Sequence, residues 1–344
     1  MILKRKLLLF SYFFLTLIFI IICLEFLLKI YFRSSEIPTD NRLKFRYMLY
    51  SKDKVFDEHK NFFKFQPNLL SRHLLYYYKE GKFLKVWDYE FNTNNFGLVQ
   101  KSDIFPKEDS ILFLGDSFTQ GQGAIPWIDK FQGKISGYQV INGGILGTGF
   151  QQFENIYEHI NKNFEIKKVV VIYIGGDLRR GVSIASDRNV LFIPETKEEL
   201  DNLLVEQRTL RLKKKTKIKD RLKFFIRELY LYNILRTQIN MIRLKNNEVI
   251  KKNLDSINSL FKKNNPNILF INVQTANEII TGQESYETKL LNKFLNKNKY
   301  PNYKCDLSND ITNYHAIDYH PNAKGYTELF ECVKKIVQDN LVKS

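Results

Sequence analysis

Four short apolar runs divide the chain after residue 110 into segments of strand and helix length. The runs are rich in β-branched residues and three of them end in glycine, which is typical of strands buried on both faces of a sheet. They are ILFLG (111–115), YQVING (138–143), KVVVIYIGG (168–176) and NILFINV (267–273). Repetition of strand, helix and strand implies right-handed crossovers, so the pattern predicts an α/β fold with a parallel sheet covered by helices on both faces. Ligand sites in such sheets lie at the carboxyl ends of the strands.

The apolar stretch from Leu7 to Leu28 is much longer and has no polar face. Roughly 20 apolar residues span a bilayer. A cleaved signal peptide needs a shorter apolar region followed by small residues, whereas this chain continues with LKIYFR (28–33). We therefore expect residues 1–33 to form a cytoplasmic stub and an uncleaved transmembrane signal anchor. The basic residues Lys4 to Lys6 at its start place residues 34–344 outside the cytoplasm by the positive-inside rule.

Residues 34–100 carry charges and aromatic residues with little periodicity, including three tyrosines at 76–78 and the turn-rich FNTNNFG at 91–97. This composition predicts a stalk followed by a segment that packs on the main domain, which we place at 101–344. A long insertion at about 181–264 separates the third and fourth apolar runs, and its apolar residues recur at helical spacing.

The chain has 53 Lys and Arg residues against 37 Asp and Glu, a formal charge of +16. Ten of the basic residues lie between Arg208 and Arg227, where Asp220 is the one acidic residue. This run is compatible with a solvated helical face, with contact to anionic lipid headgroups or polymers, or with nucleic acid. Because an exported, membrane-tethered domain rarely meets nucleic acid, we expect no nucleic-acid partner.

Only two cysteines, Cys305 and Cys332, lie outside the apolar anchor. In an oxidising compartment they are compatible with a disulfide, and two separately buried thiols fit equally well. No Cys/His cluster has the spacing of zinc ligands, and neither a dinucleotide nor a P-loop glycine motif is present. No cofactor or metal is therefore implied.

Three segments carry residues suited to acyl transfer. Ser117 follows the first apolar run at a strand-to-helix turn, where it would act either as a helix N-cap or as an exposed nucleophile. The glycine-rich loop 143–149 can present backbone N–H groups, as an oxyanion hole requires. Asp318 and His320 precede the last helix, and there the carboxylate can orient an imidazole that accepts a hydroxyl proton. The other histidines lie in segments without such a setting: His59, His73, His159 and His315.

These segments together resemble the SGNH, or GDSL, hydrolase family over about residues 91–340. The resemblance is carried, in order, by GDSFTQGQG (115–123), VINGGILGTGFQQ (140–152), VVVIYIGGDL (169–178) and DYHPNAKGY (318–326). FNTNNFG is similar to the segment that precedes the first motif in the membrane-anchored bacterial branch of the family. The resemblance implies a three-layer α/β/α, flavodoxin-like parallel sheet and a domain outside the bacterial inner membrane.

The resemblance also implies roles for individual residues. Ser117 would be the nucleophile, His320 the general base and Asp318 the residue that orients it. The Ser117 and Gly147 N–H groups would form the oxyanion hole. The third motif departs from the family, because Gly176 stands where the family has an asparagine whose side chain is the third donor. Where it has been measured, loss of one donor costs about 2.7–4 kcal/mol of transition-state stabilisation, so activity would be weakened unless Asn142 or the Gly176 N–H replaces it.

The expected function is that of a membrane-tethered serine esterase that removes acyl groups, most plausibly acetyl, from a cell-envelope glycan or lipid through an acyl-Ser117 intermediate. The alternatives are transfer of the same acyl group to a sugar hydroxyl and a catalytically weak or inactive binding module. The substrate-shaping segments match no motif, so the sequence leaves the natural substrate open.

Overall fold

The computed structural model describes residues 2–33, 45–79, 81–124, 126–185, 190–213, 231–232 and 247–342. The chain forms two compact units, which we describe separately. The first comprises Met1–Lys44 and Val205–Lys245, and the second comprises Phe45–Leu204 and Asn246–Ser344.

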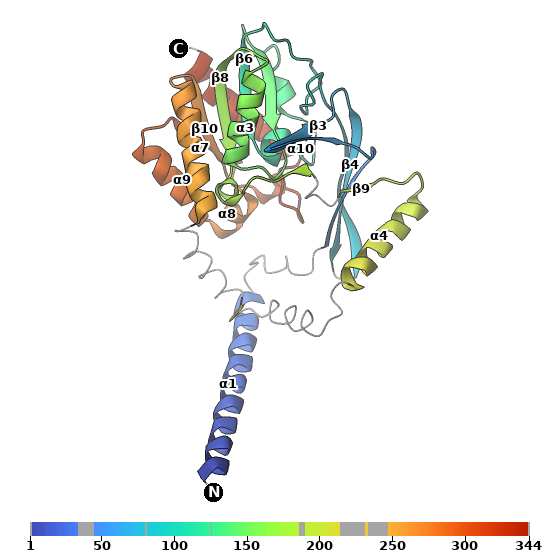
Figure 1. The fold of residues 1–344 in the computed structure, drawn as a ribbon, viewed down its shortest axis with the longest axis vertical. Coiled ribbons are helices and arrows are strands. Elements are labelled where there is room, and N and C mark those ends of the chain that lie inside the picture. The colour runs from blue at the N-terminus through green and yellow to red at the C-terminus, as the bar shows by residue number, and fades with distance from the viewer. Residues whose placement is uncertain are drawn as a thin grey trace. The chain divides into compact units, whose positions relative to one another are not determined.

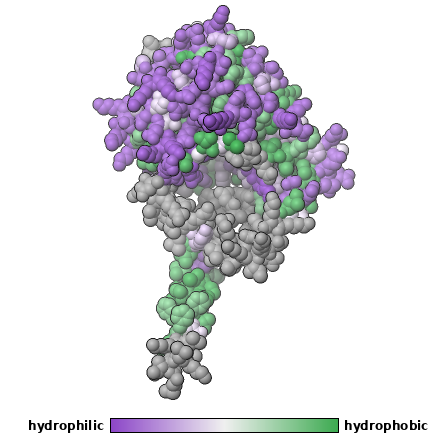
Figure 2. Space-filling model, in the orientation of Figure 1, coloured by the Kyte–Doolittle hydropathy of each residue, from purple (hydrophilic) through white to green (hydrophobic). Residues whose placement is uncertain are grey.

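The first unit contains the long helix α1 (Ile2–Arg33). Its span Leu9–Leu28 has a mean hydropathy of 2.5 and none of it is buried, so by length and composition it can cross a membrane. Figure 2 shows the hydrophobic residues that cover this helix. An N-terminal apolar helix of this kind is consistent with a signal anchor or a signal peptide. Most of the basic run expected at Arg208–Arg227 lies outside the described residues, which include only its part up to Lys213.

The second unit is built on a five-stranded parallel sheet in the order β11-β10-β8-β6-β7 (Figure 1). With the strands numbered as they occur in the chain, this is the order 2-1-3-4-5, so the predicted flavodoxin-like α/β fold is confirmed. All residues of β6, β7 and β10 are buried, as expected for strands covered on both faces. The strands are β6 (Ser110–Gly115), β7 (Gln139–Gly144), β8 (Ile166–Tyr173), β10 (Ile268–Val273) and β11 (Asn302–Cys305).

Helices cover both faces of this sheet. On one face, alternate strand residues such as Phe113 and Val170 share an apolar cluster with Leu329 and Val333 of α10. On the other face α3 and α7 pack against each other. The helices of this unit are α2 (Ser117–Gln120), η2 (Ile128–Phe131), α3 (Phe150–Asn161), η3 (Gly175–Arg179), α7 (Glu248–Asn264), α8 (Ala276–Thr281), α9 (Tyr286–Lys297), η5 (Ile311–Asn313), α10 (Ala323–Val337) and η6 (Gln338–Val342).

A second sheet forms from segments that the sequence did not predict as strands. From Phe45 on, the region expected to be a stalk and packing segment folds into β1, β4 and β5, and the insertion adds β9 beside β1. We call this four-stranded sheet, in the order β5-β4-β1-β9, the accessory sheet. Helix α4 (Lys197–Lys213) begins soon after β9, and its Leu204 packs into an apolar cluster with Tyr47 and Leu74 of the accessory sheet. The remaining strands are β1 (Phe45–Tyr50), β2 (Phe56–His59), β3 (Phe62–Phe65), β4 (Leu70–Lys79), β5 (Lys82–Asn92) and β9 (Val190–Phe192).

Cys305 and Cys332 form a disulfide that joins the end of β11 to α10, with their Cα atoms 5.9 Å apart. Of the two arrangements that the sequence allowed for these cysteines, the structure has the disulfide. Disulfides persist in oxidising compartments, so the bond agrees with a domain outside the cytoplasm.

Candidate active site

Ser117 is the first residue of α2, and one residue, Asp116, separates it from the carboxyl end of β6. The cap of this helix is Asp116, whose carboxylate accepts the Phe118 N–H at 2.9 Å. The Ser117 hydroxyl is therefore not used as a helix cap, which was one of its two predicted roles. It remains available for chemistry.

Two glycines bring α2 close to the sheet. A Cβ atom added to Gly115 would lie 1.9 Å from the Thr119 Oγ1, and one added to Gly144 would lie 2.3 Å from the Gln120 N. Neither glycine has a positive φ, so close approach of the backbone, and not an unusual conformation, requires them. The helix packs closely against the ends of β6 and β7 because both strands end in glycine.

The structure brings Ser117, His320 and Asp318 together. The Ser117 Oγ lies 2.9 Å from the His320 Nε2, and the Nδ1–H of the same ring donates to the Asp318 Oδ2. This is the arrangement in which an imidazole can remove the proton of a serine hydroxyl while a carboxylate fixes its tautomer. The Asp318 side chain is only 3% exposed and that of His320 14% exposed.

The backbone conformation between Asp318 and His320 explains how side chains two positions apart in the sequence contact each other. Tyr319 has a φ of 63°, in the left-handed region that few non-glycine residues adopt. Its N–H donates to the His315 O, and the His315 N–H donates to the His320 O, which closes the turn. The His315 Nε2 lies 3.0 Å from the Gly123 O, so this histidine anchors the turn to the segment after α2.

Asp318 is held as a carboxylate. Burial disfavours its charge, but the neighbouring His320 and Arg46, together with the hydrogen bonds from His320 and Tyr77, outweigh burial and lower the pKa of Asp318 to about 2. The acid that orients the imidazole is therefore ionised throughout the neutral range.

The expected oxyanion donors lie at the ends of β7 and β8. Gly147 has a φ of 67° and Gly176 is the second residue of the short helix η3, and both are half-buried. The Asn142 side chain is fully buried, where it donates to the Val99 O and accepts from the Gly144 N–H. Asn142 is thus engaged in supporting β7 and does not replace the missing amide.

Space is available at Gly176. A Cβ added there would meet only the Ile174 Cδ1, at 3.8 Å. Gly176 also lines an open hollow of about 450 Å³ together with Arg179, Arg180 and Thr275.

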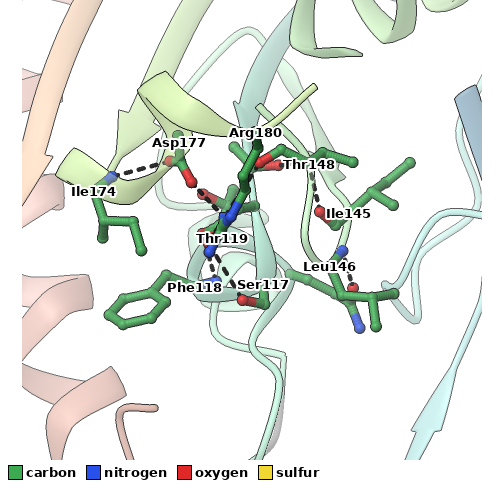
Figure 3. Close-up of polar contacts among 12 residues, drawn as sticks. Ser117, Phe118, Thr119, Ile145, Leu146, Thr148, Ile174, Asp177 and Arg180 are labelled. Atoms are coloured by element: carbon green, nitrogen blue, oxygen red, sulfur yellow. Dashed lines mark hydrogen bonds and ion pairs between the residues drawn. The ribbon is translucent and has the colours of Figure 1, made fainter. Parts of the chain in front are cut away.

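Arg180 lines this hollow and also lies close to Ser117 (Figure 3). Its Nη1 donates to the Asp116 Oδ2 at 2.6 Å, to Asp177 Oδ1 and to the Thr148 O at 3.2 Å. The Ser117 Oγ lies 3.3 Å from the same Asp116 oxygen. Among the described residues, Nη1 is the only guanidinium nitrogen of Arg180 with an acceptor, so Nε and Nη2 are available to a ligand.

Asp116 and Asp177 are both fully buried and share this one guanidinium. Burial, followed by the charge of Asp116, raises the pKa of Asp177 well above its ordinary value, against the opposing effect of Arg180. The sequence analysis missed Arg180. Its only sequence signal was a basic residue three positions after Asp177, which becomes meaningful once β6 and β8 are known to be neighbours.

The accessory sheet supplies a second set of residues that the sequence analysis missed. Tyr77 of β4 donates its hydroxyl to the Asp318 Oδ1, and the Arg46 Nε of β1 lies 4.0 Å from the same oxygen. Trp87 of β5 packs edge-on against the His320 ring, with centroids 5.4 Å apart at 82°. Tyr77 lies within the tyrosine triplet at 76–78, but nothing in the sequence connected that triplet to Asp318.

Within the described residues, no group of three or more His, Cys, Asp or Glu side chains could hold a metal ion.

Comparison with known proteins gives matches only among solved structures. No protein-family model and no curated protein matches the chain. The chain is similar in structure to a lipase/acylhydrolase from Enterococcus faecalis, at 14% identity over 69% of this chain and 97% of that one, with a TM-score of 0.36. It is also similar to a GDSL-like lipase from Bacteroides thetaiotaomicron, at 13% identity over 67% of this chain and 88% of that one, with a TM-score of 0.35. A third similar structure is a family 3 carbohydrate esterase from Clostridium thermocellum, at 14% identity over 68% of this chain and 97% of that one, with a TM-score of 0.36. Because these TM-scores are below 0.5, an assignment of function depends on the geometry of the site itself.

Proposed function

We propose that this chain is a membrane-tethered serine esterase whose catalytic domain lies outside the bacterial inner membrane. The observation that carries the proposal is the line of contacts from the Ser117 Oγ through the His320 imidazole to Asp318, at the carboxyl end of a parallel sheet. The apolar helix α1 serves as the uncleaved anchor, through residues 7–28, and the disulfide between Cys305 and Cys332 suits an oxidising compartment.

Catalysis begins when the His320 Nε2 takes the proton of the Ser117 hydroxyl as its oxygen attacks the ester carbonyl. The carbonyl oxygen becomes an oxyanion, and the ester C–O bond then breaks as His320 returns the proton to the leaving alcohol. Water attacks the acyl-Ser117 in the same way, with His320 again as base. The products are the free acid and the restored serine hydroxyl.

Donors to the oxyanion are the N–H groups of Ser117 and Gly147 together with the Arg180 guanidinium. Gly176 has no side chain to serve as the third oxyanion donor, and Arg180 takes that role. It lines the same hollow as Gly176 and is fixed by three acceptors beside Ser117. A preorganised donor in a buried site stabilises developing charge without reorganisation during the reaction. A guanidinium remains charged at every pH in which the protein is folded.

The substrate class is a short acyl ester, acetyl above all, of a cell-envelope glycan or lipid. Ser117 is only 3% exposed, which favours a small acyl group at the nucleophile. The leaving alcohol belongs to the surface polymer or lipid near the anchor, and the basic run at Arg208–Arg227 suits an anionic surface.

The test uses the full chain in detergent with a fluorophosphonate probe and with p-nitrophenyl acetate. We expect covalent labelling and hydrolysis by the native chain, and neither by Ser117→Ala. Asp129→Asn is the matched control, because Asp129 is a partly buried carboxylate that belongs neither to the Ser117–His320–Asp318 triad nor to the Arg180 cluster. Absence of Ser117-dependent labelling and turnover would show that the domain is an inactive binding module. Acetylation of an added sugar in preference to water would instead identify the transferase.

A further inference from the structure

The three consecutive tyrosines of β4 point to two different faces of the accessory sheet. Side chains alternate along a strand, so Tyr76 and Tyr78 share one face and Tyr77 takes the other. Tyr76 and Tyr78 pack against the apolar cluster around Tyr47 and Leu204, on the side of α4. Tyr77 reaches Asp318, which lies 241 positions later in the chain.

Both carboxylate oxygens of Asp318 are engaged by residues from different segments. Oδ2 accepts the Nδ1–H of His320, as the proposed esterase mechanism requires. Oδ1 accepts the Tyr77 hydroxyl and lies 4.0 Å from the Arg46 Nε. A carboxylate held through only one oxygen is free to rotate about its Cβ–Cγ bond, whereas one held through both is not.

We propose that Tyr77 and Arg46 are positioning residues of the catalytic site, through which the accessory sheet fixes the orientation and the charge of Asp318. This proposal rests on the proposed esterase function, because it concerns the acid of that mechanism. Under this proposal the accessory sheet is part of the catalytic machinery, because the parallel sheet alone does not hold both oxygens of Asp318.

The charge around Asp318 is set by the titratable and charged groups that face it from every element packed against it. These are Arg46, His73, Tyr77, His315, His320 and Tyr326. His73 stays neutral, because burial and then the charge of Arg46 lower its pKa to about 3. Tyr77 also stays neutral, because burial and then the charge of Asp318 raise its pKa. Arg46 and the Tyr77 hydroxyl thus offset part of the carboxylate charge that His320 would otherwise meet.

Removing the Tyr77 hydroxyl has two expected effects on catalysis. The carboxylate loses one of its two anchors, so His320 is less well placed to take the serine proton. The remaining charge of Asp318 also acts more strongly on the imidazole and favours its protonated form, which cannot serve as a base. The rate should fall, and the acidic limb of its pH profile should move to higher pH.

The experiment measures the rate of fluorophosphonate labelling against pH for the full chain in detergent, with three tyrosine variants. Tyr77→Phe should lower the maximal rate by about tenfold, the effect of losing one hydrogen bond to a charged group, and should move the acidic limb upward by several tenths of a pH unit. Tyr76→Phe and Tyr78→Phe are matched controls on the opposite face of the strand. Both should stay within about twofold of the native rate at an unchanged pH profile.

A second pair of variants separates positioning from a general loss of fold. Arg46→Met should also move the acidic limb upward, and Arg46→Lys should restore it, because the lysine keeps the positive charge. If the native chain is labelled but Tyr77→Phe matches Tyr76→Phe in rate and profile, the positioning role is refuted while the esterase stands. If the native chain itself is not labelled, the esterase proposal fails and the positioning role fails with it. A slower Tyr77→Phe with an unmoved pH profile and a lowered unfolding temperature would assign Tyr77 a purely structural role.

Discussion

Two clusters of buried carboxylates lie beside Ser117, and the pKa of the acid at the centre of each is shifted in opposite directions. Asp318 is surrounded by His320, Tyr77 and Arg46, which outweigh burial, and its pKa falls to about 2. Asp177 has a guanidinium in contact, but burial and then the charge of Asp116 outweigh it, and the pKa of Asp177 rises well above the ordinary value. The comparison shows that burial alone does not decide the charge of a carboxylate. The balance between burial and the donors and cations around each acid decides it.

The two clusters also have different tasks. In the proposed mechanism, the cluster at Asp318 must keep a full negative charge to orient His320 and to stabilise the imidazolium that forms. The cluster at Asp177 holds Arg180 and the start of η3 beside the end of β6, and it has two acids for one base. Asn253 of α7 supports the same segment by donating to the Leu178 O and the Arg180 O.

The largest difference between the clusters should appear on converting each acid to its amide. Asp318→Asn should lower the rate of p-nitrophenyl acetate hydrolysis by about 10³- to 10⁴-fold, because the amide stabilises the wrong tautomer of His320. Asp177→Asn should lower it by less than about tenfold, because it removes repulsion between two buried acids. Steady-state kinetics on both variants measure the contrast, and equal losses would contradict it.

Removing the guanidinium that Asp116 and Asp177 share should destabilise the second cluster, which has two acids and one cation. Arg180→Met leaves Asp116 and Asp177 buried without a cation, which should cost about 3–5 kcal/mol of unfolding free energy. An acid whose pKa is raised in the folded state favours folding below its unfolded pKa, and this contribution is lost as the pH rises through the folded value. The variant should therefore be least stable at neutral pH and recover on acidification, as measured by urea unfolding in detergent.

The double variant Arg180→Met/Asp177→Asn is the control for that result. It keeps one acid without a cation instead of two, so it should regain part of the lost unfolding free energy at neutral pH. A double variant no more stable than Arg180→Met would show that repulsion between Asp116 and Asp177 is unimportant.

A smaller effect is expected from adding an amide at Gly176. The position has room for a side chain, and Gly176→Asn should raise the turnover of the native chain by less than tenfold if Arg180 already stabilises the oxyanion. In an Arg180→Lys background the same substitution should raise turnover more strongly, since the lysine lacks the planar donor set. Equal gains in both backgrounds would show that Arg180 does not act on the oxyanion.

The smallest effect on catalysis should come from a feature remote from both clusters. Replacing Cys305 and Cys332 by serine opens a loop of 27 residues, which should cost about 3–4 kcal/mol of unfolding free energy. The rate of p-nitrophenyl acetate hydrolysis at 25 °C should remain within about twofold of the native rate. A large loss of activity in a folded double-serine protein would mean that the disulfide also positions the turn at Asp318.

Periodicity was sufficient to predict the parallel sheet but not the accessory sheet. The four apolar runs became β6, β7, β8 and β10, because strands buried on both faces carry their own signal. The fifth strand β11 (Asn302–Cys305) is a short edge strand with one buried residue, too little for a pattern. The strands β4 and β5 mix charges with aromatic side chains on both faces, so no clean alternation marks them.

The residues of the candidate site also fall into those that the sequence predicted and those that it did not. Ser117, Asp318 and His320 were predicted because each lies in a local motif, and the structure brings the three together. Arg180 and Tyr77 belong to no motif, and their roles depend on partners 64 and 241 positions away. Glycine in place of an amide at 176 was visible in the sequence, but the open space around it and the guanidinium beside it were not.

The distance along the chain between Tyr77 and Asp318 has a consequence for how the protein is made. Tyr77 leaves the ribosome early, whereas Asp318 follows 241 residues later. Contacts of such high sequence separation form late in folding. Under the proposed function, a growing chain carries Ser117 through synthesis without the base that activates it. The proposed esterase is therefore expected to be inactive until Asp318 and His320 have folded against Ser117.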